Sequence, residues 1–187
     1  MPESNSKKSA FKEIFLPIRV LVAICIIIGA SMAAINMMTA PKIAEENSKK
    51  EQEALSVVLP QNQGFEKIKL TREYESVVAI YADKGSNSLA VMLSIKGYDS
   101  SNPMSVAVGF DKDGKITKCS VISCAGETKG IGTKVSNEDF LSRFNGKNTV
   151  SDVDTISGAT ISSKAFKKAV EEAIVAVKDY RTAEVTK

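Results

Sequence analysis

The apolar and polar positions divide this chain into an uncharged run, a charged stretch and a mixed domain. Val20 to Met38 contains no charged residue and approaches the ~20 residues that a helix needs to cross a bilayer. The pattern predicts four parts: a cytoplasmic tail over 1–19, a transmembrane helix over 20–38, a helical stalk over 39–60 and an extracytoplasmic domain over 61–187.

The charges on either side of the uncharged run predict its orientation. Acidic Glu45 and Glu46 follow it, and basic residues precede it, namely Lys7, Lys8, Lys12 and Arg19. The positive-inside rule then predicts a single-pass protein of the cell (inner) membrane, with a cytoplasmic N-terminus and an external domain. A cleaved signal peptide is the alternative, because Ser31-Met32-Ala33 has the small residues of a cleavage site. Either reading places the domain outside.

The charged stretch after the run has the composition of a helix. Good helix formers dominate from Lys42 to Leu59. Pro41 suits a helix start, and Pro60 is expected to end the helix. Because apolar residues gather only at its two ends, we expect the stalk to dock on the domain near Leu55.

The domain alternates between strand-like runs and turn-forming residues. The predicted strands cover residues 76–81, 89–95, 104–110 and 116–122. Asp111 to Gly114 is expected to join the last two strands in a hairpin.

Two helices are predicted after the strands. Residues 137–144 form a short helix that Asn137 is expected to cap, and residues 161–180 carry an apolar stripe at helical spacing. The glycine-rich segment 125–135 between strand and helix is predicted to be a loop. Together, these strands and helices predict an α+β domain, in which helices pack on an antiparallel sheet.

The amino-acid composition excludes several kinds of catalytic and metal site. The chain has 187 residues and no histidine, which excludes catalytic triads with histidine and histidine-based zinc sites. Its net charge of +3 is too small to argue for nucleic-acid binding. Cys119 and Cys124 cannot complete a tetrahedral zinc site by themselves. They either form a disulfide or serve as small apolar residues.

The segment Asp154-Thr155-Ile156-Ser157-Gly158-Ala159-Thr160 carries the most specific signal. It leads directly into the last predicted helix. The first turn of a helix offers unpaired N–H groups and the positive end of the helix dipole, which together favour phosphate. Thr160 has three candidate roles: it caps the helix, contacts a phosphate, or is esterified to one.

This segment resembles the flavinylation motif D-x-x-S-G-A-T of the FMN-binding domain family. The chain is similar in particular to the G subunits of Rnf electron-transport complexes and more distantly to the C subunits of sodium-pumping NADH:quinone oxidoreductases. Gly97-Tyr98, the Met104–Ile116 strand and turn, and Gly126-Glu127-Thr128-Lys129-Gly130-Ile131-Gly132 also resemble family segments. Lys129 stands where the family usually has proline.

The resemblance implies that Thr160 carries covalent FMN through a phosphoester bond. A separate flavin transferase would transfer FMN from FAD and release AMP. The implied supporting residues are Asp154 and Ser157, which position the segment, and Gly158 and Ala159, which leave the hydroxyl accessible. Glu127 and Thr128 would offer polar contacts to the ring or the ribityl chain. No metal site is expected.

The resemblance also implies an electron carrier in a complex that couples electron transfer between ferredoxin and NAD to ion transport. Its partners would be membrane, flavin and iron–sulfur subunits, and the isolated chain would have no turnover of its own. Two alternatives stay open: a membrane-anchored extracytoplasmic binding module without covalent flavin, or the related subunit of a sodium-pumping complex.

Overall fold

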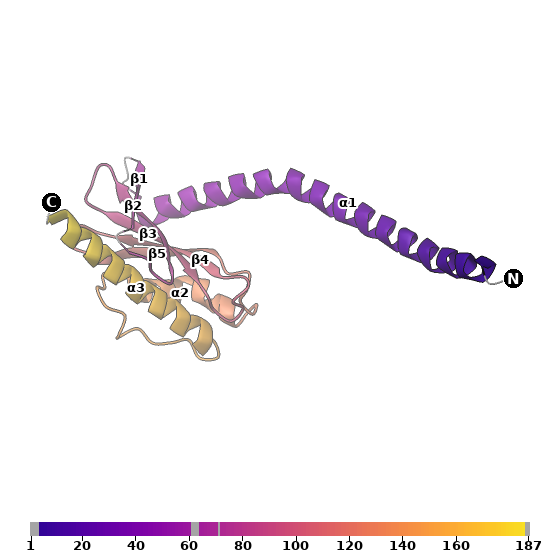
Figure 1. Cartoon of the computed structure of the whole chain (residues 1–187). Coiled ribbons are helices and arrows are strands. Elements are labelled where there is room, and N and C mark those ends of the chain that lie inside the picture. Colours follow the sequence, from indigo (N-terminus) through magenta and orange to yellow (C-terminus); the bar gives the residue numbers. More distant parts are fainter. Residues whose placement is uncertain (1–3, 61–63, 71, 186–187) are drawn as a thin grey trace. The chain divides into compact units, whose positions relative to one another are not determined.

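A computed structural model describes residues 4–60, 64–70 and 72–185, with side chains from residue 17 to residue 184. The ends of the predicted tail and domain, at residues 1–3, 61–63 and 186–187, lie outside the described residues. The chain divides into two units, residues 1–48 and residues 49–187. Figure 1 shows the order of their elements along the chain.

The first unit consists of one long helix that continues into the second. Helix α1 covers Ser4–Val58 without a break, and Pro17 and Pro41 lie inside it. The expected helix start at Pro41 was therefore wrong. Proline removes one backbone hydrogen bond, but good helix formers on both sides continue the helix. Within the described residues, the segment Pro17–Val58 is long and apolar enough to cross a membrane.

The second unit is built on a five-stranded antiparallel sheet in the order β1-β2-β3-β4-β5. The strands are β1 (Phe65–Ile68), β2 (Val77–Asp83), β3 (Leu89–Ile95), β4 (Met104–Phe110) and β5 (Ile116–Ser123). The predicted hairpin is present, with Val108 opposite Cys119. The α+β fold with helices packed on an antiparallel sheet is confirmed.

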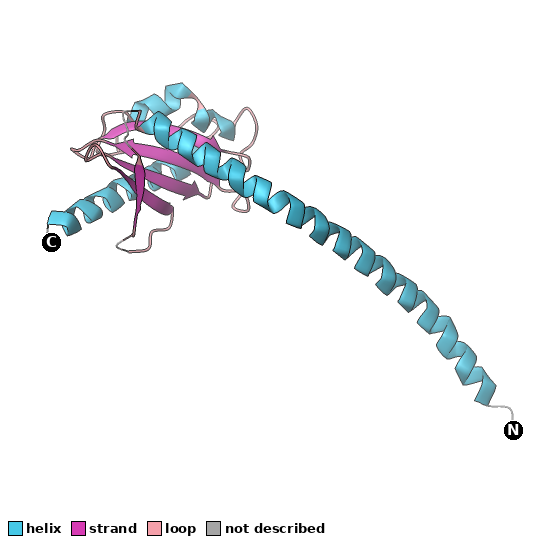
Figure 2. Ribbon diagram, turned by 90° about the horizontal axis from the view of Figure 1, so that it is seen from above, coloured by secondary structure: helices cyan, strands magenta, loops and turns pink. Residues whose placement is uncertain are grey.

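Helices cover both faces of the sheet (Figure 2). One face packs against α3 (Thr160–Val185) and the short elements η1 (Gly132–Ser136), α2 (Glu138–Leu141) and η2 (Ser142–Phe144). Asn137 precedes α2, but its side chain makes no capping hydrogen bond, contrary to expectation.

The core of this face is continuous from the sheet to α3. Alternate residues of β3 and β4 point into it, as the two-residue period of a strand requires. Phe166 of α3 is fully buried, with its ring centroid 5.5 Å from that of Phe140 and 5.3 Å from that of Phe144. This aromatic cluster fixes the first half of α3 on the sheet.

The other face packs against the end of α1. Leu55 and Val58 of α1 are buried there, as the expected docking near Leu55 requires. The sheet presents small residues to them, including Ala90 and Ala107. Gly109 is required at this contact, because a Cβ there would collide with the carbonyl oxygen of Val58.

Candidate functional site

The segment before α3 is a loop held at intervals by buried side chains. Val150, Val153 and Ala159 are buried, whereas Asp154 and Ser157 are exposed. The carbonyl oxygen of Asp154 lies 3.5 Å from a guanidinium nitrogen of Arg143. The loop therefore presents its polar residues to solvent from a fixed backbone.

A tight turn connects this loop to α3. The amide of Ala159 donates to the carbonyl oxygen of Ile156 at 3.0 Å, and Gly158 has a φ of +82°. Glycine is favoured at the third position of a type II turn because that position needs a positive φ. A Cβ at Gly158 would meet no atom within 4 Å, so the space beside the turn is open.

Thr160 is the first residue of α3, and its side chain is exposed. No described residue forms a hydrogen bond with its hydroxyl. As in the first turn of any helix, the N–H groups of Thr160, Ile161 and Ser162 have no acceptor within α3, and no other described residue accepts from them. The hydroxyl that forms hydrogen bonds at this turn belongs to Ser163. It donates to the carbonyl oxygen of Ala159 at 2.8 Å and accepts from the Ile156 amide at 3.2 Å. In this structure the Thr160 side chain is thus not a helix cap.

Glu127 connects the glycine-rich loop to the same turn of α3. Its carboxylate is buried, with only 7% of the residue exposed. One oxygen accepts from the Tyr98 amide at 3.0 Å, and the other accepts from the hydroxyl of Ser162. A Cβ at Gly97 or at Gly132 would collide with this carboxylate. The structure therefore brings together three segments that the sequence analysis singled out separately.

Thr128 lies at the exposed surface of the glycine-rich loop. Its carbonyl oxygen accepts from the amides of Ile131 and Thr133, and Gly130 adopts a φ of +76°. These bonds hold the loop without the proline that the family pattern has at position 129. Contacts of Glu127 and Thr128 with flavin stay predictions.

Three exposed apolar side chains flank this junction. Tyr98 is 66% exposed, Ile131 49% and Ile161 59%. Tyr98 itself bonds to Glu127, Ile161 precedes Ser162, and Ile131 precedes Gly132. Sequence patterns do not identify this group, because its members come from three distant segments that only the fold joins at Glu127.

The lysines near the start of α3 differ in their partners. Lys168 forms an ion pair with Glu75 at 2.8 Å, and Lys167 donates to the carbonyl oxygen of Val153. Lys164, one turn after Thr160, is exposed. Of the three, Lys164 is the one placed to add positive charge beside the helix start.

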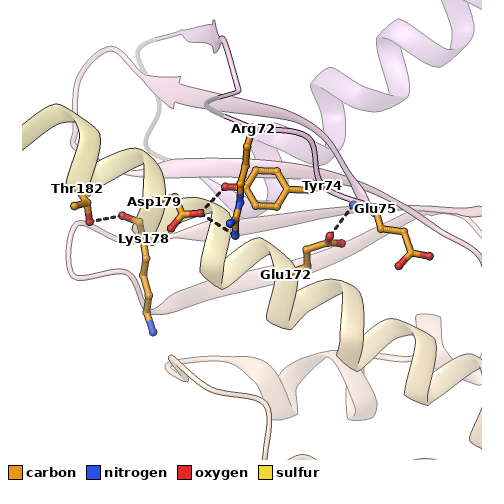
Figure 3. A network of polar contacts seen from close by, with 7 residues as sticks. All are labelled: Arg72, Tyr74, Glu75, Glu172, Lys178, Asp179 and Thr182. Atoms are coloured by element: carbon orange, nitrogen blue, oxygen red, sulfur yellow. Dashed lines mark hydrogen bonds and ion pairs between the residues drawn. The ribbon is translucent and has the colours of Figure 1, made fainter.

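The second half of α3 is fastened to the segment before β2 (Figure 3). Glu172 accepts from the amides of Glu75 and Ser76 at 2.6 Å and 2.7 Å. Asp179 accepts from the Tyr74 hydroxyl at 2.9 Å and pairs with Arg72 at 3.0 Å. Burial and the hydrogen bond to Asp179 raise the pKa of Tyr74 above its ordinary value. We call this set of contacts the α3 clasp.

The cysteines do not form a disulfide. Cys119 is buried in the core and Cys124 is half-buried, and both are free thiols. Burial raises the pKa of the Cys119 thiol to about 12, so it stays protonated at neutral pH. Among the described residues, no group of three or more cysteine, aspartate or glutamate side chains is arranged to hold a metal ion.

A cavity of about 350 Å³ lies at the far end of α3, between Asp83, Lys112 and Arg181. None of its lining residues belongs to the predicted site. The candidate site at Thr160 lies instead at the exposed start of α3.

Comparisons with known proteins match the part of the chain that contains Glu127 and Thr160. Residues 97–175, which include Glu127 and Thr160, match the FMN-binding domain family. The chain is also 28% identical over 174 residues to the G subunit of the proton-translocating ferredoxin:NAD(+) oxidoreductase complex of Clostridium ljungdahlii. That match covers 86% of this chain and 90% of its relative. Residues 97–175 are therefore similar to FMN-binding domains, and the resemblance of the chain to the G subunits of Rnf complexes, seen first in its motifs, is confirmed.

Proposed function

We propose that this protein is a membrane-anchored flavoprotein electron carrier in an Rnf-type ion-translocating ferredoxin:NAD oxidoreductase. We further propose that Thr160 carries its FMN through a phosphoester bond. Support for the assembly comes from the similarity to a G subunit and from the apolar segment of α1. Because that relative belongs to a ferredoxin:NAD(+) oxidoreductase, the Rnf assignment is favoured over the sodium-pumping quinone reductase.

The observation that carries the FMN assignment is the start of α3. It lies inside the matched FMN-binding domain, and it combines an exposed hydroxyl with N–H groups that have no described acceptor. Such N–H groups and the positive end of the helix dipole favour a phosphate. The residues present therefore fit a phosphate bonded at Thr160. When bound, FMN would supply the redox chemistry, and the protein would hold and orient it.

Attachment requires a reaction at the Thr160 hydroxyl. Thr160 Oγ1 bonds to the FMN phosphorus of FAD, and the bond from that phosphorus to the bridging oxygen breaks. AMP leaves with the bridging oxygen, and the hydroxyl proton passes to a base of a flavin transferase. The exposed Asp154 and Ser157 offer this enzyme a recognition surface, and the open space beside Gly158 leaves its approach free.

Flavin fluorescence in a denaturing gel tests the attachment. The full chain, produced together with a flavin transferase, should give a fluorescent band. Thr160→Ala should abolish it, whereas Thr155→Ala, a hydroxyl lost from the same loop, should keep it. A non-fluorescent wild-type band of unmodified mass would contradict covalent attachment and favour a binding module without it.

We also propose that the N-terminus lies in the cytoplasm and the domain on the outer face of the cell membrane. The basic residues before the apolar run support this orientation. N-terminal sequencing of the mature protein tests the anchor. An intact N-terminus agrees with a retained helix, whereas a start near Ala34 would show that the segment is a cleaved signal peptide.

A further inference from the structure

We infer that Glu127 is a positioning residue, whose buried carboxylate fixes the direction in which a group attached to Thr160 leaves the protein. This inference rests on the proposed function for the identity of the attached group. Its structural basis is the junction of three segments at one carboxylate: the Tyr98 amide, the glycine-rich loop that carries Glu127, and the hydroxyl of Ser162.

The carboxylate fills space that two glycines leave open. Gly97 and Gly132 have no side chain, and a Cβ at either position would occupy the space of a Glu127 oxygen. A buried charge is stable only when it is hydrogen-bonded, and Glu127 is bonded on both oxygens. Displacing the carboxylate would therefore break both bonds at once.

The link from Glu127 to Thr160 follows from helix geometry. Successive helical residues are rotated by about 100°, so Ser162 and Thr160 point in nearly opposite directions. Ser162 is buried, with its hydroxyl on Glu127, while Thr160 is exposed. Fixing Ser162 inward therefore fixes Thr160 outward, toward solvent.

Glu127 influences the attached group indirectly, by holding its protein neighbours in place. Both carboxylate oxygens are engaged with protein donors, and the residue is buried, so the groups offered to a flavin are its neighbours. The glycines at 97 and 132 serve the same purpose, since they make room for the carboxylate.

The experiment compares Glu127→Ala, Glu127→Gln and Ser162→Ala in the full chain, produced with a flavin transferase. The readouts are visible circular dichroism and fluorescence anisotropy decay of the attached flavin. Glu127→Ala should reduce the circular dichroism at least twofold and speed the decay. Glu127→Gln should restore part of the signal, because its amide oxygen accepts from one donor. Ser162→Ala should give a smaller loss in the same direction.

The matched control is Glu172→Ala. Glu172 also accepts two hydrogen bonds through one carboxylate, but it lies 12 residues along α3 from Thr160, or about 18 Å. This variant should leave both flavin signals unchanged. Wild-type signals in Glu127→Ala would overturn the inference.

A second measurement needs no flavin. In the unlabelled wild-type chain, the Tyr98 amide should be protected from hydrogen exchange, and Glu127→Ala, which removes its acceptor, should raise its exchange rate at least tenfold relative to amides in β3. Unchanged exchange in Glu127→Ala would overturn the positioning role, and so would an unprotected Tyr98 amide in the wild-type chain, which needs no variant to fold. A wild-type chain that never acquires flavin would instead contradict the proposed function, so the two failures are distinguishable.

Discussion

The exposed start of α3 and its second half differ in how their polar groups are bonded. In the second half, the α3 clasp pairs Glu172 and Asp179 with groups from the segment before β2. In the first turn, Thr160 exposes a hydroxyl and α3 exposes N–H groups that no described residue accepts from. A helix end with a purely structural role is normally satisfied by a cap. This contrast is what we expect if the first turn of α3 receives the phosphate proposed at Thr160.

The largest expected effect comes from removing the aromatic ring that anchors the first half of α3 in the core. Phe166→Ala should lower the free energy of unfolding by about 3–5 kcal/mol, because a fully buried aromatic ring would leave a cavity. Denaturant unfolding measures this change. Val175→Ala, at a partly exposed position of α3, is the control and should cost under about 0.5 kcal/mol. Equal costs for the two variants would contradict the aromatic cluster as the anchor of α3.

A smaller and local effect is expected from opening the α3 clasp. Glu172→Ala leaves the amides of Glu75 and Ser76 without their acceptor and should cost about 1–2 kcal/mol, since the site is partly exposed. Glu171→Ala, its exposed neighbour, should cost little. Hydrogen exchange should rise in residues 72–76 while flavin attachment at Thr160 stays at the wild-type level. Loss of attachment would show that the two halves are not independent.

The smallest effect is a dependence on alkaline pH at Tyr180, in the second half of α3. Burial, and then the hydrogen bond to Glu184, raise the pKa of Tyr180 from 10.0 to about 12, and the pKa of Tyr74 is also raised. A raised folded-state pKa means that the neutral tyrosine contributes stability below pH 10. That contribution is lost as the pH rises toward 12. Unfolding free energies measured across this range should fall less in Tyr180→Phe than in the wild type.

Local sequence patterns predicted most of the sheet and the last helix. The runs at 89–95 and 104–110 became β3 and β4 with the expected limits, because β-branched residues alternate there between clear turn signals. β1 was missed, since Phe65–Ile68 is short and its two middle residues are charged. At Pro41 the strong helix formers on both sides outweighed the local preference of proline for a helix start.

The sequence also identified the loop that ends in Thr160, but not what surrounds it. Ser162 and Glu127 are 35 residues apart, and their hydrogen bond depends on how the sheet brings the glycine-rich loop to α3. The same holds for the exposed Tyr98, Ile131 and Ile161, which lie in separate segments. Contacts between residues so far apart produce no periodic pattern in the sequence. The motifs therefore predicted which residues belong to the site but not how they are arranged in space.

The most direct test of the account is mass spectrometry of the tryptic peptide 148–164, taken from the full chain produced with a flavin transferase. This peptide contains Thr160 together with several other hydroxyl residues. We predict a mass increase equal to FMN less one water, with fragmentation placing it on Thr160. An unmodified peptide, or an increase placed on any other residue, would contradict the account.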